Sequence, residues 1–317
     1  MIYFVVQNKG HGSAILRGIH ISKKLNELGL FTKVVTESEL SKDEINSLFV
    51  WVKNINLDLI KQLPNNTHVY DVVDNYIYQK ELVQSAIQSR LVDHLIVNNE
   101  FMKLQIHNEN NISLKDISVI HHHWDPRIST ARKENQSNLT FGFLGSVASL
   151  AHTDNFLHYR TLSDKYKVRF YDTEIGKDVS DLVNNDKKIV VKRNPDAMEQ
   201  LKIHFNCHVS IRQNNIPESL YKTSAKVVTA SALGHNIITT YEEATKDILP
   251  SDYPFILRKT DLKSVIEMFD LVIDDYNDKK ILWNRGLDTM KTLKEKTSLS
   301  KIVEDNYLSI FTKFKLL

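Results

Sequence analysis

The residues best suited by type to ligand binding or catalysis lie in the stretch Ile216–Thr240, around the start of an expected helix. Lys222, Ser224 and Lys226 stand at its beginning, and Gly234 follows its apolar part. A helix N-terminus offers free N–H groups and a partial positive charge, so this combination favours a bound anion such as a diphosphate. An ordinary α/β helix with lysines in its first turn has the same pattern, and that alternative stays open.

Arg212 stands just before this stretch, at the end of an expected buried strand over 204–212. A guanidinium at a strand end can bind a phosphate through two parallel hydrogen bonds. Together with Lys222 and Lys226 it could stabilise the charge that grows on a leaving diphosphate, without a metal ion. The alternative is a surface salt bridge between Arg212 and Glu218.

Two acids, Asp71 and Asp74, close another expected strand, over 68–74. Ligands of open α/β sheets bind beyond the carboxyl ends of the strands. Both aspartates are therefore candidates for a catalytic base or for binding an acceptor. Asp74 also suits the N-cap of the helix that follows, which is the competing interpretation.

Three consecutive histidines, at 121–123, precede Trp124 and Asp125. Neighbouring side chains point in different directions, and no second cluster with zinc-ligand spacing accompanies them, so we expect no metal site. His123 is a candidate general base. A hydrogen-bonded linker without chemistry is the alternative.

Strand-like apolar runs alternate with segments of helical period, which predicts an α/β fold. The first such unit is an apolar strand at 2–6, then a loop with His11, Gly12 and Ser13, a helix and a second strand. That loop lacks the full G-x-G-x-x-G pattern, so a dinucleotide site is weakly supported. The polar segment Ala131–Asn138 marks the expected domain boundary.

Composition narrows the class of protein. A chain of 317 residues with 42% hydrophobic and 25% charged residues is typical of a globular protein of about two domains. The formal net charge of +2 gives no support to nucleic-acid binding. A single cysteine, Cys207, fits a reducing compartment, and no apolar run approaches the ~20 residues that span a bilayer. We therefore expect a cytoplasmic protein, with possible association at the inner face of the membrane.

The stretch from Lys222 resembles the donor-site segment of GT-B glycosyltransferases, whose pattern runs roughly K-P-S-x-K, two hydrophobic residues, E-A-x-A-L-G-x-P, a hydrophobic residue and I. The matching residues are Lys222, Ser224, Lys226, Ala230, Ala232, Leu233, Gly234 and Ile238. Thr229 and Tyr221 stand where many retaining members carry the two glutamates of an E-x7-E motif. The HHHWD segment and the run Phe141–Gly145 are similar to the family's interdomain segment and donor-domain opening.

This resemblance implies two Rossmann-like domains that face a cleft. Residues 1–130 would form the acceptor domain and residues 138–299 the nucleotide-sugar donor domain, with the C-terminal helix 300–317 packing back on the first. The implied activity is metal-independent transfer of a sugar from a nucleotide-diphosphate donor, with UDP as the expected nucleotide, to a hydroxyl acceptor on a glycan or a lipid-linked molecule. No cofactor is expected beyond the nucleotide sugar, which is a substrate.

The resemblance also suggests roles for single residues. The donor and its diphosphate would contact Gly145, Arg212, Lys222, Ser224, Lys226, Thr229, Glu242 and Glu243. The nucleotide base would lie near Arg193 and Asn194, and the acceptor near His11, Gly12 and Ser13. The catalytic candidates are His123, Asp71 and Asp74, with His123 either accepting a proton or orienting a sugar hydroxyl.

Two other classes of function remain compatible with the sequence. A nucleotide-sugar epimerase of the same architecture needs no separate acceptor. A non-catalytic sugar-nucleotide or glycan-binding protein needs neither of the glutamates that Tyr221 and Thr229 replace. Donor sugar, acceptor and stereochemical outcome stay undefined at this level.

Overall fold

The computed structural model describes all residues except 74, 75, 77, 131, 134–137, 148–155, 185–193, 195–196, 213–219, 222–223 and 316–317. The chain packs as two compact units. Unit 1 comprises Met1–His123, Pro217–Thr223 and Lys296–Leu317, and unit 2 comprises Trp124–Ile216 and Ser224–Glu295.

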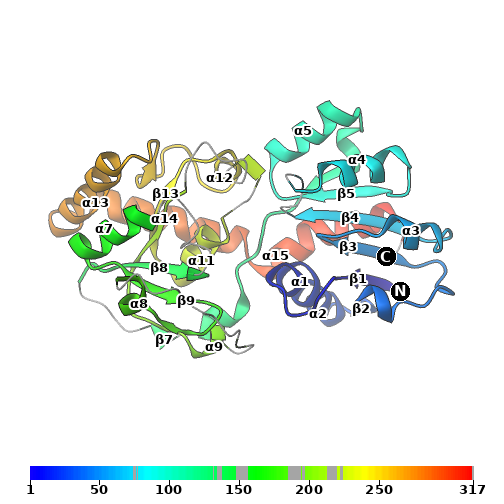
Figure 1. Cartoon of the computed structure of the whole chain (residues 1–317), viewed down its shortest axis with the longest axis horizontal. Helices are drawn as coiled ribbons and strands as arrows, with labels where there is room; N and C mark the ends of the chain where they lie inside the picture. Colours follow the sequence, from blue (N-terminus) through cyan, green and yellow to red (C-terminus); the bar gives the residue numbers. More distant parts are fainter. Residues whose placement is uncertain are drawn as a thin grey trace. The chain divides into compact units, whose positions relative to one another are not determined.

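Unit 1 is built on a six-stranded parallel sheet with the order β2-β1-β3-β4-β5-β6 (Figure 1). Its strands are β1 Ile2–Val5, β2 Thr32–Val35, β3 Leu48–Val52, β4 Thr67–Val73, β5 His94–Val97 and β6 Ile117–Val119. The strand order reverses between β1 and β3, and such a switch point is where open α/β sheets bind ligands.

The helices of unit 1 connect these strands and close the chain. They are α1 Gly12–Ala14, α2 His20–Glu27, α3 Leu57–Lys61, α4 Lys80–Gln88, α5 Glu100–Asn110, α15 Leu299–Ile302 and α16 Leu308–Lys313. Two π-helical turns, Ile15–Ile19 and Val303–Tyr307, interrupt the α-helical pattern. Short π-helical turns of this kind are frequent at functional sites.

Both faces of this sheet are buried, as expected of parallel strands with continuous apolar runs. Tyr3, Phe49 and Trp51 belong to the core on one face, whereas Phe4 and Val50 belong to the core on the other. The C-terminal helical segment completes the second core, to which it contributes Ile302, Val303, Tyr307, Ile310 and Phe311.

Unit 2 contains a second six-stranded sheet, with the order β10-β9-β8-β12-β13-β14, in which only the pairing of β10 with β9 is antiparallel. Its strands are β8 Phe141–Gly145, β9 Arg169–Asp172, β10 Lys177–Asp178, β12 Cys207–Ser210, β13 Asn236–Thr240 and β14 Ile256–Leu257. A small parallel pair joins β7 Arg132–Lys133 to β11 Lys202–Ile203. The strand order reverses between β8 and β12.

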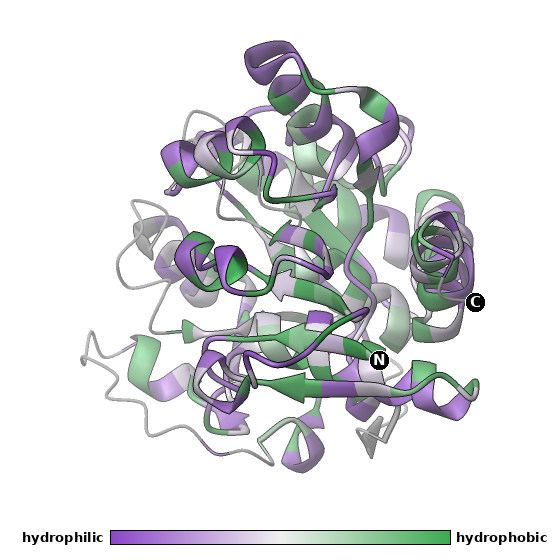
Figure 2. Ribbon diagram, turned by 90° about the vertical axis from the view of Figure 1, so that its right-hand side faces the viewer, coloured by the Kyte–Doolittle hydropathy of each residue, from purple (hydrophilic) through white to green (hydrophobic). Residues whose placement is uncertain are grey.

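The helices of unit 2 are α7 Phe156–Tyr166, α8 Ser180–Asn184, α9 Ala197–Gln200, α11 Ala225–Leu233, α12 Glu243–Lys246, α13 Leu262–Asn277 and α14 Ile281–Lys296. Helices α7, α8, α11, α13 and α14 build a core with the strands, in which Phe141, Phe170 and Phe269 are buried. A second cluster of buried residues contains Tyr171 and Phe205. Hydropathy colouring shows apolar strands and helices of mixed character (Figure 2). The two sheets have the mixed α/β architecture expected from the sequence. The strand expected at 188–193 lies outside the described residues.

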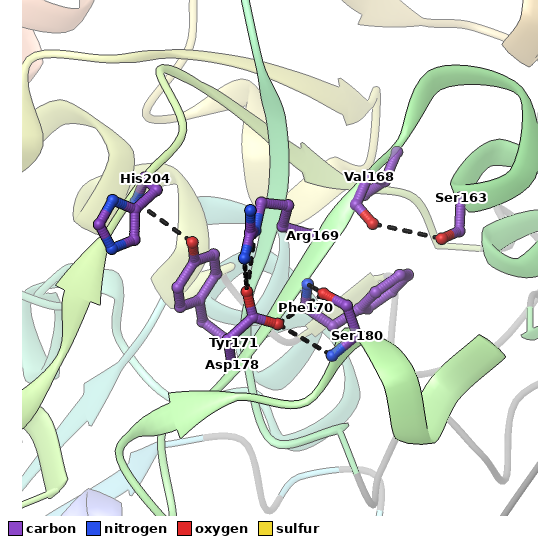
Figure 3. A network of polar contacts seen from close by, with 8 residues as sticks. All are labelled: Ser163, Val168, Arg169, Phe170, Tyr171, Asp178, Ser180 and His204. Carbon is purple, nitrogen blue, oxygen red and sulfur yellow. Dashed lines mark hydrogen bonds and ion pairs between the residues drawn. The ribbon is translucent and has the colours of Figure 1, made fainter. Parts of the chain in front are cut away.

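Polar contacts hold the β9–β10 edge of this sheet (Figure 3). The Arg169 guanidinium donates to Asp178 Oδ2, and Asp178 Oδ1 accepts from the backbone N–H and the hydroxyl of Ser180. The Ser180 hydroxyl in turn accepts from the backbone N–H of Phe170 at 2.9 Å. These contacts hold the edge strand β10 in place, and we assign them a structural role.

The most deeply buried ion pair of unit 1 joins Arg17 and Asp71, whose side chains are 1% and 0% exposed. Arg17 lies in the first π-helical turn and Asp71 in β4. Arg17 Nε and Nη2 donate to the two Asp71 oxygens at 2.8 and 3.0 Å, and Nη1 donates to the backbone oxygens of Ile120 and His121. One arginine thereby links β4 to the start of the histidine segment.

We expect Arg17→Met to destabilise the protein by about 3–5 kcal/mol, because the substitution leaves the Asp71 carboxylate buried without its partner. Urea denaturation measures this loss. Lys61→Met is the control: it breaks an ion pair between side chains that are 60% and 85% exposed, for which we expect a loss below about 1 kcal/mol. Equal effects of the two variants would contradict a structural role for the buried pair.

His94, at the start of β5, fixes the C-terminal helix α16. Lys313 Nζ lies 3.3 Å from His94 Nδ1, and His94 Nε2 lies 2.8 Å from the Ser118 hydroxyl. Burial, followed by the positive charge of Lys313, lowers the pKa of His94 to about 4. The imidazole is therefore neutral in the folded protein at neutral pH, and its Nδ1 accepts a hydrogen bond from the lysine ammonium while Nε2–H donates to the serine hydroxyl.

Because the pKa of His94 in the folded protein lies below that of an unfolded histidine, the unfolded chain binds more protons between about pH 4 and 6.5. Stability should be full above that window and should fall as the pH drops through it, by at most about 1.4 kcal/mol per pH unit for this group. Urea denaturation at pH 7 and pH 5 measures the loss. His94→Asn should show a shallower pH dependence, and identical slopes for both proteins would refute the assignment.

Candidate functional site

The carboxyl ends of β8, β12 and β13 bring the predicted donor-site residues of unit 2 together. Gly145 ends β8, Arg212 follows β12 and Glu242 follows β13. β8 and β12 flank the point where the strand order reverses. The helix α11 begins next to them, with Ser224 as its N-cap residue. Residues far apart in the sequence therefore converge at the position where open α/β sheets bind ligands.

Lys226, in the first turn of α11, lies against the end of β8. A Cβ atom built on Gly145 would stand only 2.8 Å from Lys226 Cε, so the lysine occupies the space that the missing side chain leaves. Its ammonium also lies 4.9 Å from the centre of the Phe143 ring, within the range of cation–π attraction. Glycine at 145 thus permits a cation at the helix start, which the sequence alone did not reveal.

Arg212 is held by an acid from the neighbouring strand. Its Nη1 donates to Glu242 Oε2 at 3.2 Å, and the Thr240 hydroxyl donates to Glu242 Oε1 at 2.7 Å. Burial raises the pKa of the Glu242 carboxyl, and the nearby charges of Arg212 and Lys226 oppose this shift. The predicted alternative partner, Glu218, lies outside the described residues.

Gly145, Arg212, Ser224 and Lys226 are referred to below as the cationic cluster. Ser224 is buried, and its hydroxyl oxygen lies 3.5 Å from that of Ser210 at the end of β12. The cluster joins two positive side chains to the free N–H groups of a helix N-terminus, which is an arrangement that binds phosphate oxygens.

The other predicted donor residues are less informative. Thr229 is half-buried in α11, and Glu243 pairs with Lys246 within α12. The backbone N–H of Asn194 donates to Glu174 O at 2.8 Å. Lys222, Arg193 and Asp74 lie outside the described residues, so their predicted roles stay predictions.

In unit 1, the predicted acceptor loop lies at the switch point between β1 and β3. His11 precedes α1, which begins at Gly12 and Ser13, and all three residues follow β1 directly. The backbone N–H of His11 donates to Asn8 O at 3.1 Å and closes the turn. His11 and Gly12 are exposed, so the loop is accessible on unit 1.

Two of the predicted catalytic residues of unit 1, Asp71 and His123, are buried. Asp71 forms the ion pair with Arg17 and is 0% exposed, so its carboxylate is not accessible to a substrate. His123 Nε2 lies 3.2 Å from His20 Nδ1, and His123 Nδ1 has no hydrogen-bond partner among the described residues. Burial, followed by His20, lowers the pKa of His123 well below its usual range. A neutral imidazole of this kind orients a hydroxyl better than it removes a proton.

The histidine segment does not gather into a metal-binding group. His121 Nδ1 lies 2.9 Å from the backbone oxygen of Asn98, so its ring is turned toward the end of β5. In the part of the chain that the structure describes, no three His, Cys, Asp or Glu side chains are placed to hold a metal ion. Within the same part, no helix has the length and apolarity needed to cross a membrane.

Sequence reasoning missed the partners of the predicted residues. Arg17, His20 and Thr240 each contact a predicted residue from a distant part of the chain, namely Asp71, His123 and Arg212. Arg17 is the only one with a signal in the sequence, because a charged residue interrupts the apolar face of an expected helix. His20 and Thr240 had no such signal.

No protein-family model matches the chain, and no curated protein matches it. Solved structures do. HepE from Anabaena, solved with UDP and glucose, is 9% identical with a TM-score of 0.64, over 98% of this chain and 99% of that one. A glycosyltransferase from Rickettsia africae is 12% identical with a TM-score of 0.60, over 98% and 97%.

Sucrose-phosphate synthase from Thermosynechococcus elongatus is 9% identical with a TM-score of 0.60, over 100% of this chain and 99% of that one. Structural similarity at such low sequence identity establishes the fold, but it does not establish the substrate or the mechanism. The match extends over nearly the whole length of each chain, and so it includes both sheets and their connecting helices. The protein therefore has the GT-B fold, as its resemblance to these glycosyltransferases in sequence pattern had implied.

Proposed function

We propose that the protein is a glycosyltransferase that moves a sugar from a nucleotide-diphosphate donor to an acceptor hydroxyl. The observation that carries this proposal is the cationic cluster of unit 2, which places Arg212 and Lys226 beside the N-terminus of α11 at a switch point. Structural neighbours of the same fold support the reaction class, and the UDP bound to one of them supports a uridine nucleotide.

In this proposal the diphosphate lies against the cationic cluster. Arg212 and Lys226 compensate the charge that develops on the leaving diphosphate, and the α11 N–H groups donate to its oxygens. This stabilisation needs no metal ion, which is why we propose a metal-independent reaction. Lys222 belongs to the same site by its place in the sequence, two residues before the helix N-cap.

We assign the acceptor to unit 1, through the accessible loop of His11, Gly12 and Ser13. His123 is proposed to orient a hydroxyl through its Nδ1 atom, which has no partner among the described residues. Asp71 takes no part in the proposed chemistry, because its pairing with Arg17 serves the fold.

An epimerase of the same architecture, which needs no separate acceptor, is the second candidate. A non-catalytic sugar-nucleotide or glycan-binding protein is the third, and it is favoured by the absence of the two glutamates that Tyr221 and Thr229 replace. Incubation with a nucleotide sugar alone separates the three. An isomerised sugar supports the epimerase, slow hydrolysis of the donor supports a transferase, and an unaltered donor that nevertheless binds supports the binding protein.

Isothermal titration with UDP and GDP tests the donor site. We expect the wild-type protein to bind one of them and Lys226→Ala to weaken that binding at least about tenfold, which corresponds to about 1.4 kcal/mol. The lost ammonium is one of two positive side chains in the cationic cluster, so a large fraction of the attraction is removed. Lys263→Ala, on the exposed surface of α13, is the matched control for loss of one positive charge. Equal affinities of wild type and Lys226→Ala would refute the site.

Gly145→Ala tests the same site without removing a charge. The added methyl group would stand 2.8 Å from Lys226 Cε, the flexible end of a side chain, so the lysine should move and the fold should persist. We expect a loss of UDP affinity of about three- to tenfold with an unchanged melting temperature. Titration calorimetry and thermal unfolding measure the two quantities. Unchanged affinity would mean that the position of Lys226 beside Gly145 has no role in binding.

A further inference from the structure

The carboxylate of Glu242 lies beside the cationic cluster, and the proposed reaction does not use this carboxylate. It is only 4% exposed, and both of its oxygens are engaged, one by the Thr240 hydroxyl and the other by Arg212 Nη1. Burial raises the pKa of its carboxyl, and the positive charges of Arg212 and Lys226 oppose that shift. A buried acid among cations at the proposed diphosphate site needs an explanation, because it repels the ligand that the cations attract.

The Arg212–Glu242 contact differs from the buried ion pair of Arg17 and Asp71. Arg17 meets Asp71 with two short hydrogen bonds and is 1% exposed, whereas Arg212 contacts Glu242 through one bond of 3.2 Å and keeps 19% of its side chain exposed. The first geometry is closed to any ligand. The second leaves the guanidinium partly accessible and joined to its acid by a longer contact.

Neighbouring side chains hold both the acid and the backbone of Arg212 in place. The Tyr159 hydroxyl accepts from the backbone N–H of Ile211 at 2.7 Å, and the backbone N–H of Arg212 lies 3.3 Å from Thr240 Oγ1. The same threonine holds Glu242. Arg212 keeps 19% of its side chain exposed, so an anion can reach it beside a carboxylate that is held in place.

Charge balance indicates what this arrangement does. With Arg212 and Lys226 positive and Glu242 negative, the three side chains sum to one positive charge, and without Glu242 they would sum to two. A diphosphate carries at least two negative charges, so the carboxylate lowers its affinity through direct repulsion and by occupying Arg212.

We propose that Glu242 is an internal competitor of the diphosphate for Arg212, and that it holds the affinity for the leaving nucleotide low enough for release. This inference rests on the proposed function of the cationic cluster. Arg212 exchanges its hydrogen bond to Glu242 for a phosphate oxygen when the donor binds, and it returns to Glu242 when the nucleoside diphosphate leaves. Tight binding of the product slows its release and therefore turnover, so an acid that weakens binding of the nucleoside diphosphate would speed release.

The test is titration calorimetry of the full-length protein and its Glu242→Gln variant with UDP and, separately, with inorganic pyrophosphate. The glutamine removes the charge but keeps one oxygen that can accept from Arg212, and its NH2 group can donate to the Thr240 hydroxyl oxygen. We expect about tenfold tighter binding of both ligands to Glu242→Gln. Pyrophosphate has no ribose or sugar, so it reports on charge alone.

Two further variants make the result specific. Glu267→Gln removes the same charge from an exposed position on α13, where the Glu267 side chain is 63% exposed, and it should leave both affinities unchanged. In an Arg212→Met background, Glu242→Gln should gain less than about threefold, because the competition for the arginine is gone. If Glu242→Gln does not fold, Glu242→Met removes the charge with a side chain of similar length and should give the same tightening.

Three outcomes would overturn the inference. Unchanged affinity of folded Glu242→Gln for both ligands would show that the acid does not compete. Weaker UDP binding with unchanged pyrophosphate binding would show that Glu242 contacts hydroxyl groups of the nucleotide instead. Weaker binding of both would show that it positions Arg212 for the phosphate. Failure of the wild-type protein to bind any nucleoside diphosphate would instead contradict the proposed function itself.

Discussion

A charge that leaves water must meet an opposite charge, and this constraint shapes both halves of the molecule. Each unit places an arginine against a carboxylate near the carboxyl ends of its parallel sheet. Arg17 and Asp71 form a sealed pair that joins a π-helical turn to β4. Arg212 and Glu242 form a looser pair beside a helix N-terminus. The same interaction therefore stabilises the fold in unit 1 and leaves an accessible cation in unit 2.

The difference between the pairs follows from the elements that carry them. Arg17 is fixed by four hydrogen bonds, two of them to the backbone oxygens of Ile120 and His121 at the start of the histidine segment, so its geometry cannot change without local unfolding. Arg212 follows β12, where the sheet order reverses and helix α11 opens beside it. A switch point leaves space beyond the strand ends, and that space is where a ligand can replace an internal partner.

Much of the fold could be predicted because local patterns determine it. Apolar runs such as Leu48–Val52 predict buried parallel strands, and Gly234 ends α11 with the positive φ of 70° expected of a helix C-cap. The meeting of Gly145, Arg212 and Lys226 could also be anticipated, since all three stand at strand ends or at a helix start. Their proposed roles come from the resemblance to the GT-B sequence pattern, and the structure shows that the three residues lie close together.

The remaining features depend on pairings between distant residues, which a single sequence does not encode visibly. Asp71 had the position of a catalytic base, yet its partner lies 54 residues earlier and makes it a structural residue. Glu242 had the position of a hydroxyl-binding group, yet its oxygens face Thr240 and Arg212. In both cases the residue type and the strand end were visible, whereas the direction of the side chain was set by tertiary contacts.

The central claim is that the cationic cluster of unit 2 binds the diphosphate of a nucleotide. A crystal structure of the protein with UDP tests it most directly. The account predicts diphosphate oxygens within hydrogen-bond distance of Lys226 Nζ, of the Arg212 guanidinium and of backbone N–H groups in the first turn of α11. UDP bound elsewhere, with Lys226 still against Gly145 and no phosphate beside Arg212, would contradict it.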